Sequence, residues 1–178
     1  PFHCLDCTHY CEQFNQRRHD RIRDCLIVYL RRFTGVAGTV TKEPALPAPN
    51  GHRKTDILFC KDGRNQYIDV ALCNPCAPTY LEARQPGEEN PAMDMRKRTK
   101  ERDYEGLLPA DQFVPFILSA TGNMHEAARQ WVEDSAQVGK KKATRDFYRT
   151  FCFHEISFHC AQQNARARME AARRARSV

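Results

Sequence analysis

The sequence contains no apolar run that approaches the roughly 20 residues a membrane-spanning helix needs, and its mean hydropathy is −0.70. It also lacks the charged start and following apolar run of a secretory signal, because the chain opens on Pro1 and continues as PFHCLDC. No internal repeat and no polymerase motif is found along it. These absences argue against a membrane or secreted protein, and they favour an intracellular fragment of a longer chain.

The composition favours one globular domain with a basic surface. Of 178 residues, 41% are hydrophobic, which is enough to build a core in a chain of this length, and 28% are charged. The net charge of +6 suits a polyanionic partner, although many ordinary solvated surfaces carry a similar charge. The nine cysteines are odd in number and unevenly spread, so we expect reduced thiols or metal ligands rather than disulfides.

Apolar spacing predicts the first half of the fold. Residues 18–33 place apolar side chains at helical intervals with arginines on the other side, which predicts an amphipathic helix. Residues 35–44 are expected to form a short strand, and the Pro/Gly-containing residues 45–54 a loop. Strands are expected at 57–60 and 66–73, joined by a turn in which Asp-Gly favours a hairpin.

The second half adds a helix, a strand and two further helices. After a long loop over 74–90, a helix is expected at 91–104 and a strand at 113–122. The two further helices are expected to start at Asn123 and at about Lys142. Asn90 followed by Pro91 is a good helix start, and Pro115 would place its strand at an edge or a bulge. Asn123 with Glu126 resembles a capping box. The order helix, three strands, helix, strand and C-terminal helices predicts a layered α/β domain with a hairpin at its centre.

Two aspartates lie where an unpaired charge is expensive to bury. Asp69 stands inside the apolar strand 66–73, and Asp56 stands at the start of the neighbouring strand. Because side chains alternate along a strand, Asp69 faces away from the side that Ile68 and Val70 bury, and the hairpin can bring Asp56 beside it. Two converging carboxylates can hold Mg²⁺. A structural alternative is that Asp56 caps the turn RKTD and Asp69 pairs with an arginine.

The helix expected at 91–104 carries two lysines toward the same region. Met93, Lys97, Lys100 and Tyr104 share one helical face by their spacing. Because Met93 and Tyr104 would pack on the sheet, the lysines between them are drawn inward, and one of them can supply a positive charge to the acid pair. The alternative is that both lysines extend to the rim and keep their amines in water.

Five stretches of the sequence together resemble one known family. They are RRHDRIRD, KEP, KTDILF…YIDVALCNPCAPTY, KRTKERDY and FVPFILSATGNM. They are similar to the restriction-like endonuclease domain, of the PD-(D/E)XK type, that lies C-terminal to the reverse transcriptase in some non-LTR retrotransposons. The resemblance implies a partial zinc-knuckle-like segment over 1–17, a restriction-endonuclease-like core over 18–122 and a C-terminal helical extension with a basic tail over 123–178.

Carried over by position, the resemblance implies a Mg²⁺ or Mn²⁺ site. Asp56 in KTD corresponds to the first metal ligand, with Thr55 in place of the family's usual proline, and Asp69 in IDV corresponds to the second. Glu43, from the preceding strand, would complete the shell. Ala71 stands where simpler nucleases of this fold carry their lysine, and an alanine cannot take that role.

The catalytic lysine and the DNA contacts come from the same resemblance. In this family the lysine is relocated to the following helix, ahead of a tyrosine, which fits Lys100 four residues before Tyr104, with Lys97 as the second candidate. The stretch RRHD resembles the family's Arg-His-Asn, whose members would contact DNA or support the site. The expected DNA contacts are Arg18, His19, Lys54 and Tyr104.

The family also carries a Cys/His zinc knuckle before that helix, and FHCLDCTHYC looks like its trailing half. The candidate Zn²⁺ ligands are His3, Cys4, Cys7 and Cys11, with His9 competing. Tetrahedral zinc needs four ligands, and spacing this tight strains a single site, so we expect the upstream cysteine pair to lie outside this chain. The cysteines at 73, 76, 152 and 160 are expected to be ordinary buried or loop thiols.

The implied function is a metal-dependent DNA endonuclease that nicks target DNA to make a primer for reverse transcription. Its partners would be DNA and the upstream reverse transcriptase portion of the same polyprotein, with the element's RNA as a further candidate and the nucleus as the location. Two alternatives stay open. One is a catalytically inactive nucleic-acid-binding remnant of such an element, and the other is a stress- or protein-binding α/β domain with structural acids.

Overall fold

The computed structural model describes residues 8–33, 39–48, 51–61, 63–82, 90–136 and 142–176. In chain order, its elements are α1 (Thr8–Phe33), β1 (Thr39–Lys42), β2 (Ala45–Ala48), β3 (Gly51–Lys54), β4 (Ile57–Lys61), β5 (Arg64–Cys73), α2 (Pro78–Glu82), α3 (Pro91–Tyr104), β6 (Phe113–Ser119), α4 (Glu126–Ala136) and α5 (Lys142–Ala175). The fold is mixed α/β, as the sequence predicts. None of the described helices combines the length and the apolar character needed to cross a membrane.

One mixed sheet forms the centre of the fold, with the strand order β1-β4-β5-β6. Strand β4 pairs antiparallel with both β1 and β5, whereas β6 runs parallel to β5. Because β6 is the outermost strand of the described sheet, Pro115 can sit in it without breaking an inner ladder. The edge position predicted from Pro115 is confirmed.

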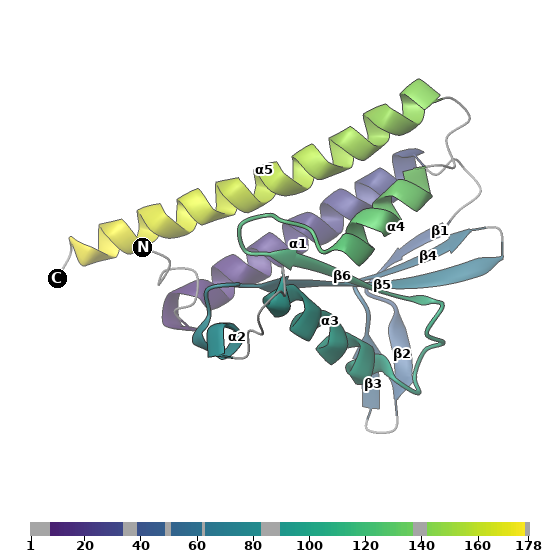
Figure 1. Ribbon diagram of the computed structural model, residues 1–178, viewed down its shortest axis with the longest axis horizontal. Coiled ribbons are helices and arrows are strands. Elements are labelled where there is room, and N and C mark those ends of the chain that lie inside the picture. Colours follow the sequence, from purple (N-terminus) through teal and green to yellow (C-terminus); the bar gives the residue numbers. More distant parts are fainter. Residues whose placement is uncertain are drawn as a thin grey trace.

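Helices cover both faces of this sheet (Figure 1). The main core joins one sheet face to α1, α4 and α5; its fully buried members include Ile22, Leu26, Leu30, Ile57, Ile68, Phe116, Leu118, Val132, Cys152 and Ile156. Burying a side chain of this kind contributes about 1.5–3 kcal/mol. Because α4 and α5 share this core with α1, residues 126–136 and 142–175 pack as one unit with the rest of the described chain.

Helix α3 covers the opposite face through a smaller cluster. Ala71 and Cys73 of β5 pack there against Ala92 and Met93 of α3, together with Ile117 of β6. Small side chains at the contact allow the helix to lie close to β5. This close packing brings the side chains of α3 within reach of Asp69, which faces the same side of the sheet as Ala71.

The helix predicted at 91–104 is confirmed, and so are the two strands of the central hairpin. The loop predicted over 45–54 is wrong, because β2 and β3 form a separate antiparallel hairpin there. Pro47 is tolerated in β2 because a two-stranded sheet has an outer edge on each strand.

Two helix starts also differ from the prediction. Helix α1 begins at Thr8, ten residues before the apolar pattern suggested. Helix α4 begins at Glu126, and its cap is His125, whose Nδ1 accepts the Ala127 N–H at 3.0 Å. Asn123 instead belongs to the turn after β6, where its N–H donates to Ser119 Oγ at 2.9 Å.

Candidate active site

The central hairpin brings the two predicted acids together through the backbone of β5. The Asp56 N–H donates to the Ile68 carbonyl at 3.1 Å, which extends the β4–β5 ladder by one residue. The Asp56 Oδ2 accepts the Val70 N–H at 2.7 Å. Asp56 therefore bonds to both chain neighbours of Asp69, and its negative charge raises the pKa of the Asp69 carboxyl.

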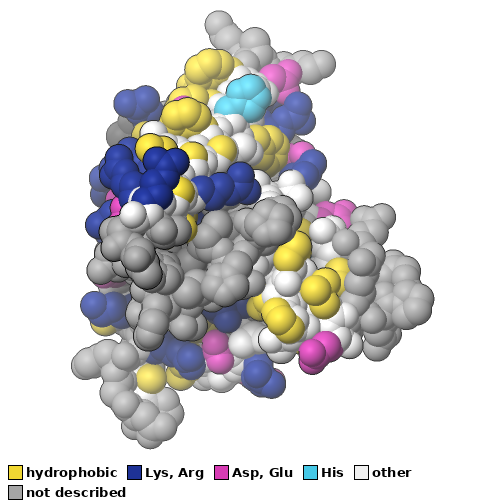
Figure 2. Space-filling view, turned by 90° about the vertical axis from the view of Figure 1, so that its left-hand side faces the viewer, with side chains coloured by type: hydrophobic (Ala, Val, Ile, Leu, Met, Phe, Trp, Pro, Cys, Tyr) yellow, Lys and Arg dark blue, Asp and Glu magenta, His cyan; other side chains and the backbone are white. Residues whose placement is uncertain are grey.

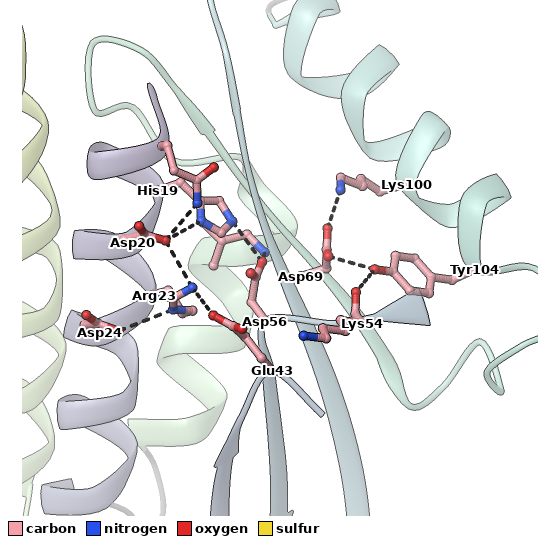
Figure 3. Close-up of polar contacts among 12 residues, drawn as sticks. His19, Asp20, Arg23, Asp24, Glu43, Lys54, Asp56, Asp69, Lys100 and Tyr104 are labelled. Atoms are coloured by element: carbon pink, nitrogen blue, oxygen red, sulfur yellow. Dashed lines mark hydrogen bonds and ion pairs between the residues drawn. The ribbon is translucent and has the colours of Figure 1, made fainter. Parts of the chain in front are cut away.

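Asp69 is a buried carboxylate held between two side chains of α3. Its exposed fraction is 5%. Lys100 Nζ lies 2.7 Å from Oδ2, and the Tyr104 hydroxyl donates to Oδ1 at 2.9 Å. Burial raises the pKa of Asp69, and this effect outweighs the opposing charge of Lys100. The site therefore holds an acid whose ionised form is disfavoured by its surroundings (Figure 3).

Tyr104 fixes the position of Asp69 rather than facing the solvent. It is only 4% exposed, and its ring centre lies 4.6 Å from that of Phe113. Its hydroxyl shares one proton between Asp69 Oδ1 and the Lys54 carbonyl, which lies 2.7 Å away. The ring is buried and the hydroxyl is engaged within the chain, which does not favour the direct DNA contact predicted for Tyr104.

His19 of α1 reaches the other acid. Its Nε2 lies 3.0 Å from Asp56 Oδ2, and its Nδ1 lies 3.5 Å from Asp20 Oδ1. Burial lowers the pKa of His19, but the hydrogen bonds and charges of Asp56 and Asp20 outweigh burial and raise it above 6.5. His19 thus supports the Asp56 carboxylate, which is one of the two roles that the family resemblance suggested for it.

The Glu43 backbone lies beside Asp56, because the Glu43 N–H donates to the Asp56 carbonyl at 2.8 Å, but the Glu43 carboxylate turns toward α1. Its Oε1 pairs with Arg23 at 2.7 Å, on the side of α1 (Figure 3). The Arg23 guanidinium is buried and also contacts Asp20 and Asp24, so it draws Glu43 toward the helix. The third metal ligand predicted at Glu43 is therefore not supported by this arrangement.

The two candidates for the catalytic lysine have different ion-pair partners. Lys97 pairs with Glu101 one turn along the exposed side of α3, whereas Lys100 points to Asp69. Ala71, which the resemblance aligns with the lysine of simpler nucleases, is buried against α3. The space beside Asp69 is thus filled from the helix and not from the strand.

The donor set suits a hard divalent cation, although it is small. No group of three or more His, Cys, Asp or Glu side chains able to hold a metal ion occurs among the described residues. Mg²⁺ commonly uses only one or two carboxylates and keeps several waters. Asp69 Oδ2 is buried and meets the Lys100 ammonium as an ion pair, without a regular hydrogen bond. A metal ion at this oxygen would therefore have to displace the Lys100 ammonium.

The remaining predicted residues fall in three places. Arg18 is 1% exposed and donates to the Ala120 carbonyl at 3.4 Å, so it joins α1 to the turn after β6, and its burial does not favour the predicted DNA contact. Lys54 is exposed at the end of β3.

His3, Cys4 and Cys7 lie outside the described residues, as do the side chains of His9 and Cys11. Cys73, Cys152 and Cys160 are buried free thiols, and Cys76 is an exposed one, as predicted.

Sequence reasoning missed the contacts that organise these acids. The ion pair of Arg23 with Glu43 joins residues 20 positions apart, and no spacing rule indicates it. The His19–Asp56 contact joins residues 37 positions apart. No protein-family model matches the sequence, and no curated protein matches it significantly.

Proposed function

We propose that this chain is a metal-dependent DNA endonuclease with a PD-(D/E)XK-type core, and that it nicks target DNA as part of a retrotransposon reverse transcriptase polyprotein. The observation that carries the proposal is the buried Asp69, which lies beside Asp56 and is approached by Lys100. A carboxylate whose pKa is raised by burial is unfavourable for stability, and such groups concentrate at functional sites. The arrangement of α1, the β4–β5 hairpin, α3 and a parallel β6 supports the proposed core.

In this proposal, Asp56 and Asp69 would hold Mg²⁺ or Mn²⁺, which lowers the pKa of bound water and offsets negative charge on a phosphate. Tyr104 keeps Asp69 oriented, and His19 does the same for Asp56. The Lys100 ammonium stands at the Asp69 carboxylate, where it can bind a phosphate oxygen and stabilise the charge that develops there. Water adds to phosphorus as the P–O3′ bond breaks, and the departing oxygen takes a proton to leave a 3′-hydroxyl primer.

The positive surface charge suits binding to the phosphates of the DNA backbone, which does not depend on the DNA sequence. Exposed arginines at positions 166, 168 and 173 follow one another along the C-terminal part of α5, and the exposed Arg176 comes directly after the helix. Figure 2 looks onto the end of the molecule where α5 terminates, and it shows Lys and Arg side chains grouped on this face. The proposed partners are DNA and the upstream reverse transcriptase portion, and the proposed location is the nucleus.

A second candidate is a catalytically inactive DNA-binding remnant, and the ion pairing favours it. Asp56 pairs with His19, Asp69 with Lys100 and Glu43 with Arg23. A set of acids that are all paired within the chain can serve structure alone.

A plasmid assay separates the two candidates. Wild-type protein is incubated with supercoiled plasmid in Mg²⁺ or in EDTA, beside Asp69→Asn and a matched surface control, Asp134→Asn on α4. We expect nicking only with Mg²⁺, its loss in Asp69→Asn and its retention in the control. The nicks should support primer extension by an added DNA polymerase, because they carry 3′-hydroxyls. Wild-type protein that binds the plasmid but leaves it supercoiled would identify the remnant instead.

A further inference from the structure

A basic strand leads directly into the first acid. Strand β3 ends at Lys54, two residues before Asp56, and Arg53 precedes it. Together with β2 it forms a hairpin that belongs to no other sheet of the described chain. In Figure 1 this hairpin projects away from the main sheet, beside the C-terminal end of α3. It therefore forms an arm next to the acids rather than a part of the core.

The hairpin is anchored to α3 by one of its faces. Leu46 is opposite Arg53 in the ladder, so both side chains lie on the same face of the hairpin. Leu46 is buried, and the Arg53 guanidinium lies 5.2 Å from the centre of the Tyr104 ring. Arg53 also donates to the Asp103 carbonyl, and its Nη2 lies 3.7 Å from the Asp103 carboxylate, so a phosphate would share the guanidinium with Asp103. These contacts fix the arm relative to Tyr104, which itself bonds to Asp69.

Lys54 leaves a positive charge at the edge of the site. Its carbonyl accepts the Tyr104 hydroxyl, while its side chain is exposed. No carboxylate of the described residues lies within ion-pair distance of its amine. Figure 3 shows Lys54 between Asp56 and Tyr104, with the Asp69 carboxylate nearby. An exposed positive charge is therefore carried two residues along the chain from Asp56.

We propose that the β2–β3 hairpin is an arm that binds the DNA backbone next to the scissile phosphate, with Arg53 and Lys54 as its two phosphate contacts. The inference rests on the proposed function and names where its substrate is held. Arg53 presents a planar guanidinium that is already positioned by Tyr104, and Lys54 adds a point charge. Contacts of this kind hold DNA in register without reading its sequence.

The test measures DNA binding under conditions where no strand is cut. Fluorescence anisotropy with a labelled duplex of about 30 base pairs, in Ca²⁺ and in EDTA, compares wild type with Lys54→Ala and with Arg53→Ala/Lys54→Ala. Arg31→Ala/Arg32→Ala is the matched control, because these exposed arginines end α1 and their replacement removes the same charge. We expect affinity about tenfold weaker in the hairpin double variant. Its salt slope should be smaller by about two, because each of two phosphates is no longer neutralised by the protein.

Lys54→Ala keeps the inference open to refutation if the double variant is unstable, because its side chain is exposed and only its carbonyl bonds to Tyr104. Far-UV circular dichroism checks that both variants fold. Hairpin variants that bind DNA as tightly as the Arg31/Arg32 control would overturn the inference, and so would wild type that binds no DNA. Weakened binding in the hairpin variants together with no nicking by wild type would support the arm and refute the endonuclease.

Discussion

The Lys100 ammonium lies 2.7 Å from Asp69 Oδ2, and it meets that oxygen on the buried side of the sheet. The Lys100 side chain is 19% exposed and the Asp69 side chain 7%, so the pair lies at the boundary between the protein interior and the solvent. Burial still raises the pKa of Asp69 despite this partner. The burial of the Asp69 carboxylate is therefore the unfavourable part of this arrangement, and the contacts with Lys100 and Tyr104 offset part of its cost.

Replacing Lys100 should remove activity without unfolding the protein. In Lys100→Met, we expect nicking of supercoiled plasmid to fall by about 100-fold or more, as for loss of one electrostatic group at a reacting phosphate. Unfolding free energy should fall by only about 1–3 kcal/mol, because the buried Asp69 can take up a proton in place of its absent partner. Lys97→Met is the matched control, since Lys97 pairs with Glu101 on the surface. Equal losses in both variants would remove Lys100 from the site.

Asp69→Asn should make the protein more stable at neutral pH while it abolishes nicking. Because the folded-state pKa of Asp69 lies above 3.8, the folded state binds more protons, and stability falls as pH rises through this range. Asparagine cannot ionise and avoids this loss, so we expect a gain of about 1 kcal/mol near neutral pH, within the range of single stabilising substitutions. Urea unfolding at about pH 4 and about pH 7 gives the comparison. A variant that is less stable at both values would contradict the reasoning.

The central hairpin and α3 were predictable because local signals agreed there. Asn90 and Pro91 define the start of α3, and the buried Met93 and Tyr104 define the face that packs on the sheet. The β2–β3 hairpin was not predictable, since prolines at 44, 47 and 49 are typical of a loop. Its pairing depends on tertiary contacts of Leu46 and Arg53, which no local pattern reports.

The candidate site was predictable where it follows from alternation along a strand or helix. Asp69 lies on the α3 side of β5 because it alternates with the buried Ile68 and Val70. The side-chain directions of Glu43 and Arg18 were not predictable, because partners distant in the sequence decide where they point. Arg23 draws Glu43 toward α1, and the Ala120 carbonyl holds Arg18 inside the fold.

Tyr104→Phe should separate positioning from packing. The substitution keeps the ring beneath the Arg53 guanidinium and beside Phe113, but it removes the hydrogen bonds to Asp69 and to the Lys54 carbonyl. Two buried acceptors are then without their donor, and stability should fall by about 1–3 kcal/mol. We expect the nicking rate at saturating DNA to fall about tenfold with little change in DNA affinity, as for loss of a group that only orients the acid. An unchanged rate would show that the hydroxyl does not position Asp69.

The thiols should differ sharply in reactivity. Burial raises the pKa of Cys73 and of Cys160 to about 11 and that of Cys25 to about 12, so their thiolate fractions in mildly alkaline buffer are very small. Cys76 is exposed. Brief treatment of the native protein with iodoacetamide, followed by peptide mass spectrometry, should label Cys76 first and the three buried thiols only after unfolding. Early labelling of Cys73 or Cys160 would mean that the sheet or α5 opens readily.

Added Mg²⁺ should stabilise the folded protein through Asp56 and Asp69. A metal that binds only the folded state at ten times its Kd adds about 1.4 kcal/mol to the unfolding free energy. In wild type we therefore expect Tm to rise with MgCl₂ relative to NaCl of equal ionic strength, and to return to its starting value after EDTA. Asp69→Asn should lose this response, whereas Asp134→Asn on the α4 surface should keep it. A rise of the same size in Asp69→Asn would place the bound cation elsewhere, and the acid pair would then be a structural feature.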